Sequence, residues 1–456
     1  DDDYAVSYGA DGHHHFTTLS VFGRSTMSDA VILLKGKHAF SKGANLGRFH
    51  INSGDGSLTS NFLYTHAFKE ENRRYLNVKE GTIFAKTVYR IIKWILNPSV
   101  AQRVYRHMII DTPDEESYLF DEAAMLCFRV NWQAPIEAFP KEVPSALPDI
   151  IFQMGSGLYG VRHHDGQFDE LRYQKVMRFT KMTEIKRAQG AKQTGGKLLA
   201  SKVSNAIAYF RGVEPHKDLF SPNQFPFAHN LEELFDFIGR LKKLSDKPVG
   251  VKVVVSSKET FDEYADLIAQ RVKEGSSAYP DFITVDGGDG GSGAAPLEMM
   301  MTVGMTIAKA LYVVDKALRD VGVREKVKVI ASEKVLTPDD AIVLFGIGAD
   351  FVAIARAFMM SAGCIRARVC SGTGGHICPV GIATQDPKKR ASFLVVKQGK
   401  EIANYHNNLI KGVKTILTVM GKESINDLEK ENLTYVNRQG QIFFNINDHF
   451  AKKLKY

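Results

Sequence analysis

Eight short apolar runs, separated by longer polar or amphipathic stretches, constrain the fold of this chain more than any other feature of its sequence. In the second half, most runs rich in β-branched residues precede a stretch with helical periodicity, which is typical of βα units around a parallel sheet. Eight such units favour a closed barrel over an open sheet, so we predict an α/β fold of the TIM (β/α)8 type. The predicted strands are Phe16–Phe22, Arg48–Asn52, Ile150–Gln153, Lys181–Ala188, Pro248–Val255, Phe282–Asp286, Val327–Ser332 and Phe351–Ala355.

The rest of the pattern divides the chain into four parts. Residues 1–62 hold the first barrel strands and a helix, and 149–390 hold the remainder of the barrel. Residues 63–148 break the rhythm and predict an insertion of helices and loops, while 391–456 predict a helical C-terminal extension. The predicted helices are Met27–Ser41, Leu231–Ser245, Lys258–Glu274, Leu297–Val321, Pro338–Phe345 and a long one from Ala391 to Met420.

Composition sets broad limits on the class of protein. With 456 residues, 44% of them hydrophobic, the chain is long enough to bury a sizeable core. The net charge of +8 comes from Lys and Arg scattered without a dense run, so we predict no nucleic-acid partner. Four cysteines in such a length indicate a reducing compartment, and no signal peptide or membrane span is apparent, so we expect a cytoplasmic protein.

One segment leaves room for peripheral membrane association. Residues 82–96 predict an amphipathic helix with Lys86, Arg90 and Lys93 on one side and isoleucines and a valine on the other. The segment is too short and too charged to cross a bilayer. It is either a helix packed over the domain or a basic helix that lies on a membrane.

Glycine-rich or polar loops follow five of the predicted strands, where the chemistry of such barrels lies. They begin at Asn52, Gln153, Gln189, Asp286 and Ala331. The loop DGGDGGSG has five glycines in eight residues, which lets backbone N–H groups approach an anionic ligand. It matches neither a dinucleotide fingerprint nor a P-loop, so we interpret it as a ligand cradle rather than a flexible loop.

Three charged side chains in predicted strands are candidates for this site. Lys252 lies within the apolar run GVKVVV, so it either points into a site or reaches solvent between helices. Glu184 and Lys186 occupy alternate positions of KMTEIKRA and so point the same way. They either bind an amino-acid-like or keto-acid substrate or form a structural ion pair. Gln189 ends the same strand, where its amide could contact the edge of a flavin ring.

Three of the four cysteines, Cys364, Cys370 and Cys378, lie within one loop, and a proline follows the last. Grouped thiolates of this kind favour an iron–sulfur ligand set. A zinc site with His376 as fourth ligand fits less well, because zinc sites prefer cysteines two to four residues apart. A disulfide with one spare thiol is disfavoured by the compartment. Cys127, in the apolar run AAMLCF, is predicted to be a core residue.

The runs KMTEIKRAQGAKQTGG, DGGDGGSGAAP and C…C…CPVGIATQDP together resemble the FMN-binding, iron–sulfur domain of glutamate synthase. The likeness extends from about residue 21 to about residue 427. It implies an FMN-bearing TIM barrel with a 3Fe–4S cluster beside the flavin, ligated by Cys364, Cys370 and Cys378. Lys252 would contact the flavin or the keto acid, Glu184 would hold the nitrogen end of the substrate, and Gln189 would bind near the flavin.

The resemblance also implies the residues that surround FMN, with the phosphate toward the last two strands. They are Asp286, Gly287, Gly288, Gly290, Gly291, Ser292, Gly293, Ser332, Glu333, Ala355 and Arg356. Three segments depart from the family pattern. The second cysteine spacing is seven residues instead of four, residues 221–230 read SPNQFPFAHN, and the segment from Ala331 lacks the glycines of the family's phosphate loop.

The implied activity is reduction of the imine of 2-oxoglutarate and ammonia, or another amine, to an amino acid. Electrons would come from ferredoxin or a reductase subunit. The likeness does not extend to the glutamine-hydrolysing domain of glutamate synthase, so a separate amidotransferase subunit is one source of ammonia. The alternatives are a flavin oxidoreductase that acts on another substrate and a membrane-associated electron-transfer module that docks through residues 82–96.

Overall fold

The computed structural model describes most of the chain. The described residues are 4–9, 14–28, 32, 34–59, 62, 76–111, 118–130, 147–163, 165–190, 197–288, 303–332, 335–370, 375–384, 389–390, 393–436, 440–443 and 445–453.

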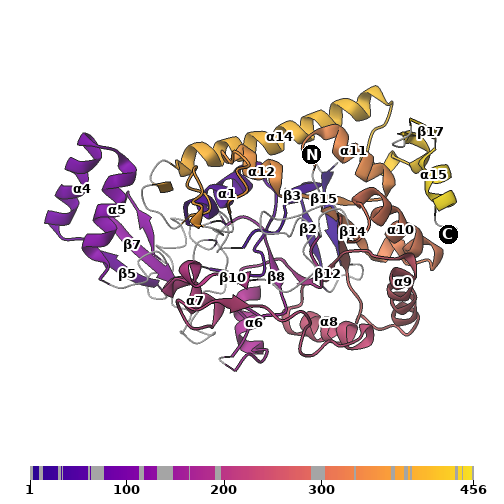
Figure 1. Cartoon of the computed structure of the whole chain (residues 1–456), viewed down its shortest axis with the longest axis horizontal. Coiled ribbons are helices and arrows are strands. Elements are labelled where there is room, and N and C mark those ends of the chain that lie inside the picture. The colour runs from indigo at the N-terminus through magenta and orange to yellow at the C-terminus, as the bar shows by residue number, and fades with distance from the viewer. Residues whose placement is uncertain are drawn as a thin grey trace.

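Eight parallel strands form a closed barrel, which confirms the predicted fold class (Figure 1). Their order around the barrel is β3, β4, β8, β9, β12, β13, β14, β15, so each strand pairs with its neighbour in sequence and the last pairs with the first. Side chains along them are almost all buried, as expected for parallel strands covered on the outside by helices. The strands are β3 (Phe22–Arg24), β4 (Ile51–Asn52), β8 (Ile150–Met154), β9 (Met182–Lys186), β12 (Val249–Val253), β13 (Phe282–Asp286), β14 (Lys328–Ser332) and β15 (Phe351–Ile354).

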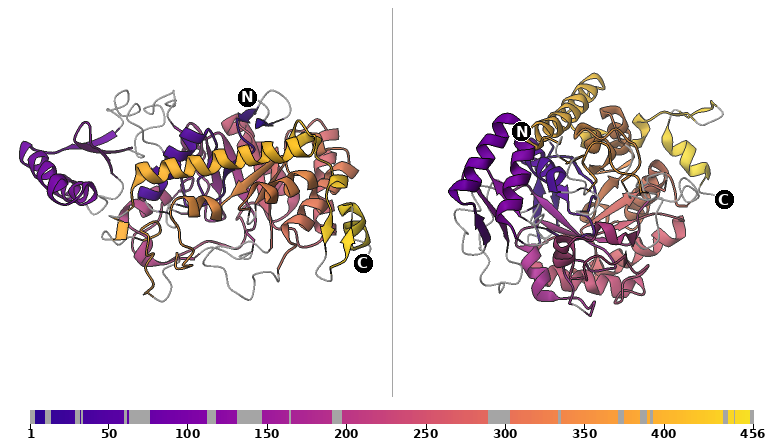
Figure 2. Two further views of the ribbon diagram at one scale, coloured as in Figure 1. Left: turned by 90° about the horizontal axis from the view of Figure 1, so that it is seen from above. Right: turned by 60° about the vertical axis from the view of Figure 1, so that its left-hand side comes forward.

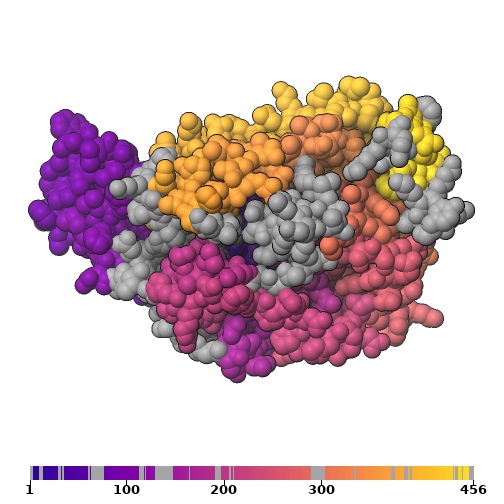
Figure 3. All heavy atoms as spheres, viewed as in Figure 1, coloured from indigo at the N-terminus to yellow at the C-terminus, as the bar shows by residue number. Residues whose placement is uncertain are grey.

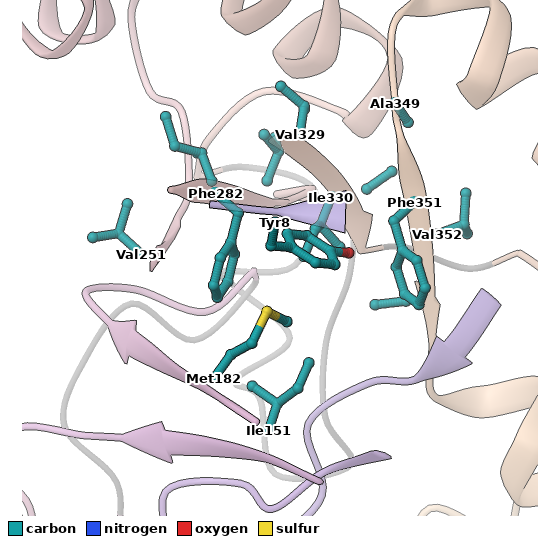
Figure 4. Packing of buried hydrophobic residues seen from close by; sticks show 14 of the residues in the cluster. Tyr8, Ile151, Met182, Val251, Phe282, Val329, Ile330, Ala349, Phe351 and Val352 are labelled. Carbon is teal, nitrogen blue, oxygen red and sulfur yellow. The ribbon is translucent and has the colours of Figure 1, made fainter. Parts of the chain in front are cut away.

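The first predicted strand is wrong in its position. Phe16–Thr18 forms β2, which pairs antiparallel with β1 (Val6–Tyr8), and the barrel strand begins only at Phe22. The hairpin covers the amino-terminal end of the barrel, where the buried ring of Tyr8 meets the ring of Phe282 edge-on at 5.5 Å (Figure 4). Both segments are apolar because one covers the core and the other crosses it, so hydrophobicity alone could not separate them.

Helices surround the barrel close to the predicted positions. α8 (Leu231–Ser245), α9 (Lys258–Lys273) and α11 (Pro338–Ile347) match within two residues. Side chains at their N-caps explain the starts: Asn230 accepts the N–H of Glu233, and Ser257 accepts that of Thr260. α1 (Leu34–Gly47) begins later than predicted, and so does α10 (Ile307–Asp320). The remaining helices beside the barrel are α6 (Glu170–Met177), α7 (Asn205–Arg211) and α12 (Arg356–Ser361), and β10 (Lys197–Leu198) pairs with β11 (Leu219–Phe220).

Residues 76–111 and 118–130, between β4 and β8 in the chain, form a lobe at one end of the molecule, which we call the insertion lobe (Figure 1, purple). It contains α4 (Ile83–Ile95) and α5 (Pro98–Ile109), but also an antiparallel sheet that the prediction of helices and loops missed. The sheet strands are β5 (Leu76–Glu80), β6 (Leu119–Asp121) and β7 (Leu126–Val130) in the order β5-β7-β6. β5 and β7 carry charged residues, Lys79, Glu80 and Arg129, so they lack the continuous apolar runs by which the barrel strands were recognised.

The insertion lobe has small cores of its own. Ala85 and Tyr89 of α4 pack against Ala101 and Tyr105 of α5 in one cluster. Cys127, fully buried on β7, belongs to a second cluster, which confirms that it is a core residue. These two clusters are separate from the main hydrophobic core, but Leu126 and Phe128 of β7 belong to that core, so the lobe is held both by its own clusters and by β7.

The C-terminal part begins with α14 (Val395–Val419), which lies along α1 and also contacts α11 (Figure 2). Its buried His406 stacks on Phe49 at 4.6 Å and shares a hydrogen bond of 2.7 Å with Ser20, just before β3. The predicted long helix is therefore confirmed. After it come 3-10 turns (Ile425–Asp427, Lys430–Asn432), the paired strands β16 (Tyr435–Val436) and β17 (Ile442–Phe443), and α15 (Ile446–Lys453). The four-part division of the chain stays a prediction.

Candidate active site at the barrel mouth

Polar side chains gather at the carboxyl ends of the barrel strands. Asn52, Lys186, Asp286 and Ser332 are each the last residue of their strand. Since all strands of a parallel barrel point the same way, these ends meet at one rim, which we call the mouth. The pairing register places Lys252 beside Lys186 on one side and Thr284 on the other. Charged and hydroxyl groups therefore occupy the interior side of the mouth rather than the apolar floor.

Glu184 is the centre of a buried hydrogen-bond network. Its Oε1 accepts from Asn52 Nδ2 at 2.9 Å and from Gln153 Nε2 at 2.5 Å. Its Oε2 accepts from Thr284 Oγ1 at 2.6 Å, a bond that crosses the interior because β12 lies between β9 and β13. Only 3% of Glu184 is exposed. These three neutral donors fix the carboxylate and leave part of its acceptor capacity for a ligand.

Lys252 points into the mouth, which decides between the two predicted orientations. It is 3% exposed, and its Nζ lies 3.4 Å from Asp286 Oδ2. The same carboxylate oxygen accepts the backbone N–H of Gly190 at 2.8 Å, next to the half-buried Gln189. A cation from β12, a carboxylate from β13 and a backbone N–H from the loop after β9 are thus brought together.

Lys186 forms a second ion pair at the mouth. Its Nζ lies 2.7 Å from Asp55 Oδ2, in the loop after β4. Burial by itself would raise the pKa of Asp55, but the Lys186 ammonium and its hydrogen bond, with a smaller effect of Arg211, hold that pKa below its usual range. Glu184 and Lys186 therefore share the mouth, as predicted, but each has a different partner, so they do not form the structural ion pair considered from the sequence.

Gln153 is a site residue that the sequence analysis missed. It is fully buried, and its Nε2 donates to Glu184 and to Thr26 Oγ1. Its Oε1 is buried with no hydrogen-bond partner among the described residues. Buried acceptors are rarely left unpaired, so this oxygen is suited to an N–H group of a ligand. Asn52 and Gln153 share a recognisable signal, since each is a polar residue at or next to the end of an apolar strand.

The glycine loop after β13 is only partly described. The Gly287 N–H donates to Ser332 O at 3.3 Å, and the Gly288 N–H donates to Met305 O at 2.7 Å. Both amides are therefore used within the protein, so the expected cradle cannot consist of these two groups. Gly290, Gly291, Ser292 and Gly293 lie outside the described residues, as does Glu333.

The ends of the seventh and eighth barrel strands lie beside the first. Ser332 is buried and shares a hydrogen bond of 3.2 Å with Ser25, which follows β3. Ala355 and Arg356 lie directly after β15, where α12 begins, and both are half-buried. In barrels of this class, the loops after these two strands and a short helix commonly hold a phosphate group. The predicted role of Ser332, Ala355 and Arg356 in FMN binding stays a prediction.

The three clustered cysteines share one neighbourhood. Cys364 and Cys370 are half-buried, Cys378 is buried, and none is in a disulfide. Burial raises the pKa of the Cys370 thiol, the thiols of Cys364 and Cys378 raise it further, and the Lys202 ammonium lowers it. Lys202 also donates to the Cys370 carbonyl. Within the described residues, however, no three His, Cys, Asp or Glu side chains are arranged to hold a metal ion, so the cluster ligands stay a prediction.

A closed parallel barrel with buried charges at its mouth defines an α/β-barrel protein with an enzyme-like site. Comparison with known proteins gives the family. Residues 11–423 match the family model described as "Conserved region in glutamate synthase", so the chain belongs to the glutamate synthase family.

Curated relatives have the same family character. The chain is 41% identical over 296 residues to "Glutamate synthase large subunit-like protein YerD" of Bacillus subtilis, covering 64% of this chain and 55% of that protein. It is 32% identical over 292 residues to "Archaeal-type glutamate synthase [NADPH]" of Thermotoga maritima, covering 63% and 53%. The matched region thus spans about half the length of these relatives.

Among solved structures, a putative lactate oxidase of Pediococcus acidilactici aligns with a TM-score of 0.44 and 10% identity, covering 96% of this chain and 83% of that one. A similarity this low carries no inference about cofactor or substrate.

Proposed function

We propose that this chain is an FMN-dependent oxidoreductase of the glutamate synthase type. It would reduce the imine of a 2-oxoglutarate-like keto acid and ammonia, or another amine, to an amino acid. The observation that carries the proposal is the buried mouth, where Lys252 faces Asp286 and a fixed Glu184 carboxylate faces the barrel interior. Membership of the glutamate synthase family supports it.

The donor and acceptor groups of the mouth fit a flavin. Gln153 Oε1 offers a buried acceptor without a partner among the described residues. Lys252 Nζ offers a buried cation, and Gln189, in the loop after β9, offers a half-buried amide. Ser332 ends β14, and Arg356 follows β15. A phosphate is commonly held beyond the ends of these last two barrel strands. When bound, FMN would supply the two-electron chemistry that no amino-acid side chain provides.

The chain's own residues would bind and orient the substrate. Glu184 has three hydrogen bonds, and an ionised carboxylate accepts about four, so one acceptor site remains for a substrate N–H. Its negative charge favours the protonated imine over the neutral form. Lys252, on the strand next to that of Glu184, and Lys186, two residues after Glu184 on the same strand, would attract the carboxylate and carbonyl oxygens of a keto acid.

The three cysteines are proposed to hold an iron–sulfur cluster, 3Fe–4S by family resemblance. Their chemistry fits such a group, since cysteine thiolates are its usual ligands. The thiols of Cys364 and Cys378 also raise the pKa of the Cys370 thiol. Their arrangement does not, because no three of the described ligands converge. We therefore assign the cluster no part in the substrate steps above. Iron and acid-labile sulfide analysis of anaerobically purified protein tests this assignment, with the triple Cys→Ser variant as control.

Electron donor and amine source are the open parts of the assignment. Ferredoxin or a reductase subunit is proposed as the donor, and free ammonia or a separate amidotransferase subunit as the source of nitrogen. Both follow from the family resemblance rather than from any contact in the structure.

A second candidate is a flavin oxidoreductase that acts on another substrate. Residues 221–230, which depart from the family pattern, lie at the mouth. The Pro222 carbonyl accepts from Ser156 in the loop after β8, and the Ala228 carbonyl accepts from Arg187 after β9. Their altered sequence therefore borders the substrate space and favours a substrate other than 2-oxoglutarate with ammonia.

Reoxidation of the reduced protein distinguishes the two candidates. The flavin of the purified protein is reduced with light and a sacrificial donor without oxygen, and keto acids are added with ammonium or methylamine. The proposal expects the oxidised flavin spectrum to return with a keto acid and an amine together, and an amino acid to appear. The Glu184→Gln variant should retain flavin but slow this step by roughly a hundredfold, because its charge and one acceptor are lost. Flavin that no keto acid and amine reoxidise would contradict the proposal.

A further inference from the structure

α4 of the insertion lobe presents an apolar face that nothing in the described structure covers. Six large side chains on or next to this helix are each more than half exposed, including Trp94 at 88% and Ile83 at 86%. Exposed apolar residues are common singly, but a contiguous group of this size marks an interaction surface. The group, which we call the α4 face, consists of Ile83, Phe84, Ile91, Trp94, Ile95 and Leu96.

The helix itself is firmly anchored, so the exposure does not come from fraying. The Thr82 side chain caps the start by accepting the N–H of Ala85 at 3.2 Å. Ala85 and Tyr89 are buried against α5, and the Tyr89 ring lies 5.7 Å from that of Tyr105. α4 therefore has two apolar sides, and among the described residues only the side that faces α5 and Phe120 of β6 is packed within the lobe.

A row of cations borders the α4 face. Lys86, Arg90 and Trp94 are spaced four residues apart, so they follow one another along the helix edge. Residues 82–110, which hold both helices of the lobe, contain no Asp or Glu. Their basic residues are Lys86, Arg90, Lys93, Arg103 and Arg106. Lys93 pairs with Glu122 beside the helix, whereas Arg90 is exposed next to the apolar side chains.

The position of the lobe leaves the face accessible. The insertion connects the carboxyl end of β4 to β8, so it leaves the barrel from the mouth side. Figure 3 shows it as a lobe at one end of the molecule, and Figure 1 shows α4 on the outer side of α5. A large flat surface could therefore approach the helix without contacting α14 or α15.

We infer that the α4 face docks on an anionic lipid bilayer, with the helix lying in the plane of the interface. An apolar helix face, a cationic border and an exposed tryptophan form the combination that a lipid headgroup region accommodates. No helix in the described part of the chain is long and apolar enough to cross a bilayer, so α4 would lie on the surface. The inference does not depend on the proposed catalytic activity.

Tryptophan fluorescence tests the inference at a single site. The chain has two tryptophans, Trp94 and Trp132, so Trp132→Phe in the full chain leaves Trp94 as the only one. This protein is mixed with vesicles of phosphatidylcholine and phosphatidylserine, with and without bromine on the acyl chains. Docking predicts a blue shift of the Trp94 emission and quenching by the brominated lipid. An unshifted, unquenched emission would overturn the inference.

Co-sedimentation with the same vesicles measures how much the basic and the apolar residues contribute to binding. The variant Lys86→Glu/Arg90→Glu should bind the anionic vesicles at least tenfold more weakly, since each basic residue contributes about 1 kcal/mol near such a surface. Ile91→Gln/Ile95→Gln should weaken binding further by removing apolar contact. The matched control is Val419→Gln, an apolar residue 83% exposed at the end of α14, which should leave binding unchanged. Equal binding of all variants would contradict the inference.

Self-association is the alternative use of an apolar face. Sedimentation velocity without lipid should show that wild type and Ile91→Gln/Ile95→Gln have the same mass. If the wild type is instead a dimer that this variant dissociates, the face is a contact between copies and the lipid inference is wrong. Flavin content and reoxidation are measured on the same samples and should not change, so failure of docking is separable from failure of the proposed function.

Discussion

α4 and α14 are both amphipathic helices outside the barrel, yet they treat their apolar residues in opposite ways. α14 buries its stripe against α1 and α11, whereas α4 buries two residues against α5 and exposes six around its other side. The stripe of α14 consists of Gly399, Ile402, Ala403, His406, Leu409, Val413 and Leu417.

The difference is visible in the spacing of the apolar residues. Those of α14 form one continuous stripe along the helix, which α1 and α11 cover. Those of α4 lie on two sides, at Ala85 and Tyr89 toward α5 and around Trp94 away from it. A helix with two apolar sides, of which the described residues of the lobe cover only one, therefore indicates a second contact outside the described chain.

An aspartate introduced on each helix should have the most different effects on the free energy of unfolding. Val413→Asp places a carboxylate at a fully buried position of α14, which should lower the free energy of unfolding by about 4 kcal/mol or prevent folding. Ile91→Asp on α4 is the matched control and should change it by about 0.5 kcal/mol or less. Urea unfolding followed by circular dichroism measures both. Equal destabilisation would mean that the α4 face is covered in solution.

Tyr89→Ala tests whether the insertion lobe is stabilised locally. Removal of this buried ring should cost about 3 kcal/mol, because it leaves a cavity between α4 and α5. Hydrogen exchange should show faster exchange in α4 and α5 and no change in the barrel strands. Thr87→Ala, on the exposed side of the same helix, is the control. Loss of protection in the barrel would show that the lobe and barrel fold as one unit.

His406, on the covered helix α14, should make the stability of the protein depend on pH. Burial lowers its pKa to about 4, against about 6.5 in an unfolded chain. Between these values the unfolded chain binds a proton that the native protein does not, so native stability falls as pH falls. From pH 7.5 to pH 5 this group should remove about 2 kcal/mol.

Burial also lowers the pKa of the half-buried His38 and of the buried His50, so the variant His406→Gln isolates the contribution of His406. Urea midpoints at the two pH values should differ less in the variant than in the wild type. The same pH dependence in both proteins would show that the buried site beside Ser20 does not hold His406 neutral.

The smallest expected effect concerns the ion pair beside α4. Lys93 and Glu122 are both more than 40% exposed, so their pairing contributes little in water. Lys93→Gln should change the free energy of unfolding by about 0.5 kcal/mol or less, while it weakens vesicle binding slightly. A larger loss of stability in the same urea titration would mean that the pair, rather than the Tyr89 cluster, holds the helix in place.

The barrel was predictable because its strands follow a simple physical rule. Seven of the eight lie within a few residues of the predicted positions. Runs of β-branched residues between amphipathic helices are typical of the strands of a parallel α/β sheet. The first strand was misplaced because Phe16 belongs to a hairpin over the barrel floor, where apolar residues are equally favoured. The sheet of the insertion lobe was missed because charged residues interrupt β5 and β7, so neither forms a continuous apolar run.

The candidate site was predictable in part. Glu184 and Lys252 stand out in sequence as charges inside apolar strands, and both lie at the mouth. Gln153 and Asn52 were not selected, because a neutral amide in a strand carries no such signal until its buried partner is known. The partners of Lys186 also depend on how the loop after β4 folds back, which no local pattern specifies.

The most direct test of the central claim, that the barrel mouth holds a flavin, is the FMN content of three purified proteins. Wild type, Lys252→Met in the mouth and Trp94→Gln on the α4 face are compared after a check that their urea midpoints agree. The account predicts one FMN per chain in the wild type and in Trp94→Gln, and a clear loss in Lys252→Met. A wild-type chain that neither carries nor binds FMN, or equal FMN in all three proteins, would contradict it.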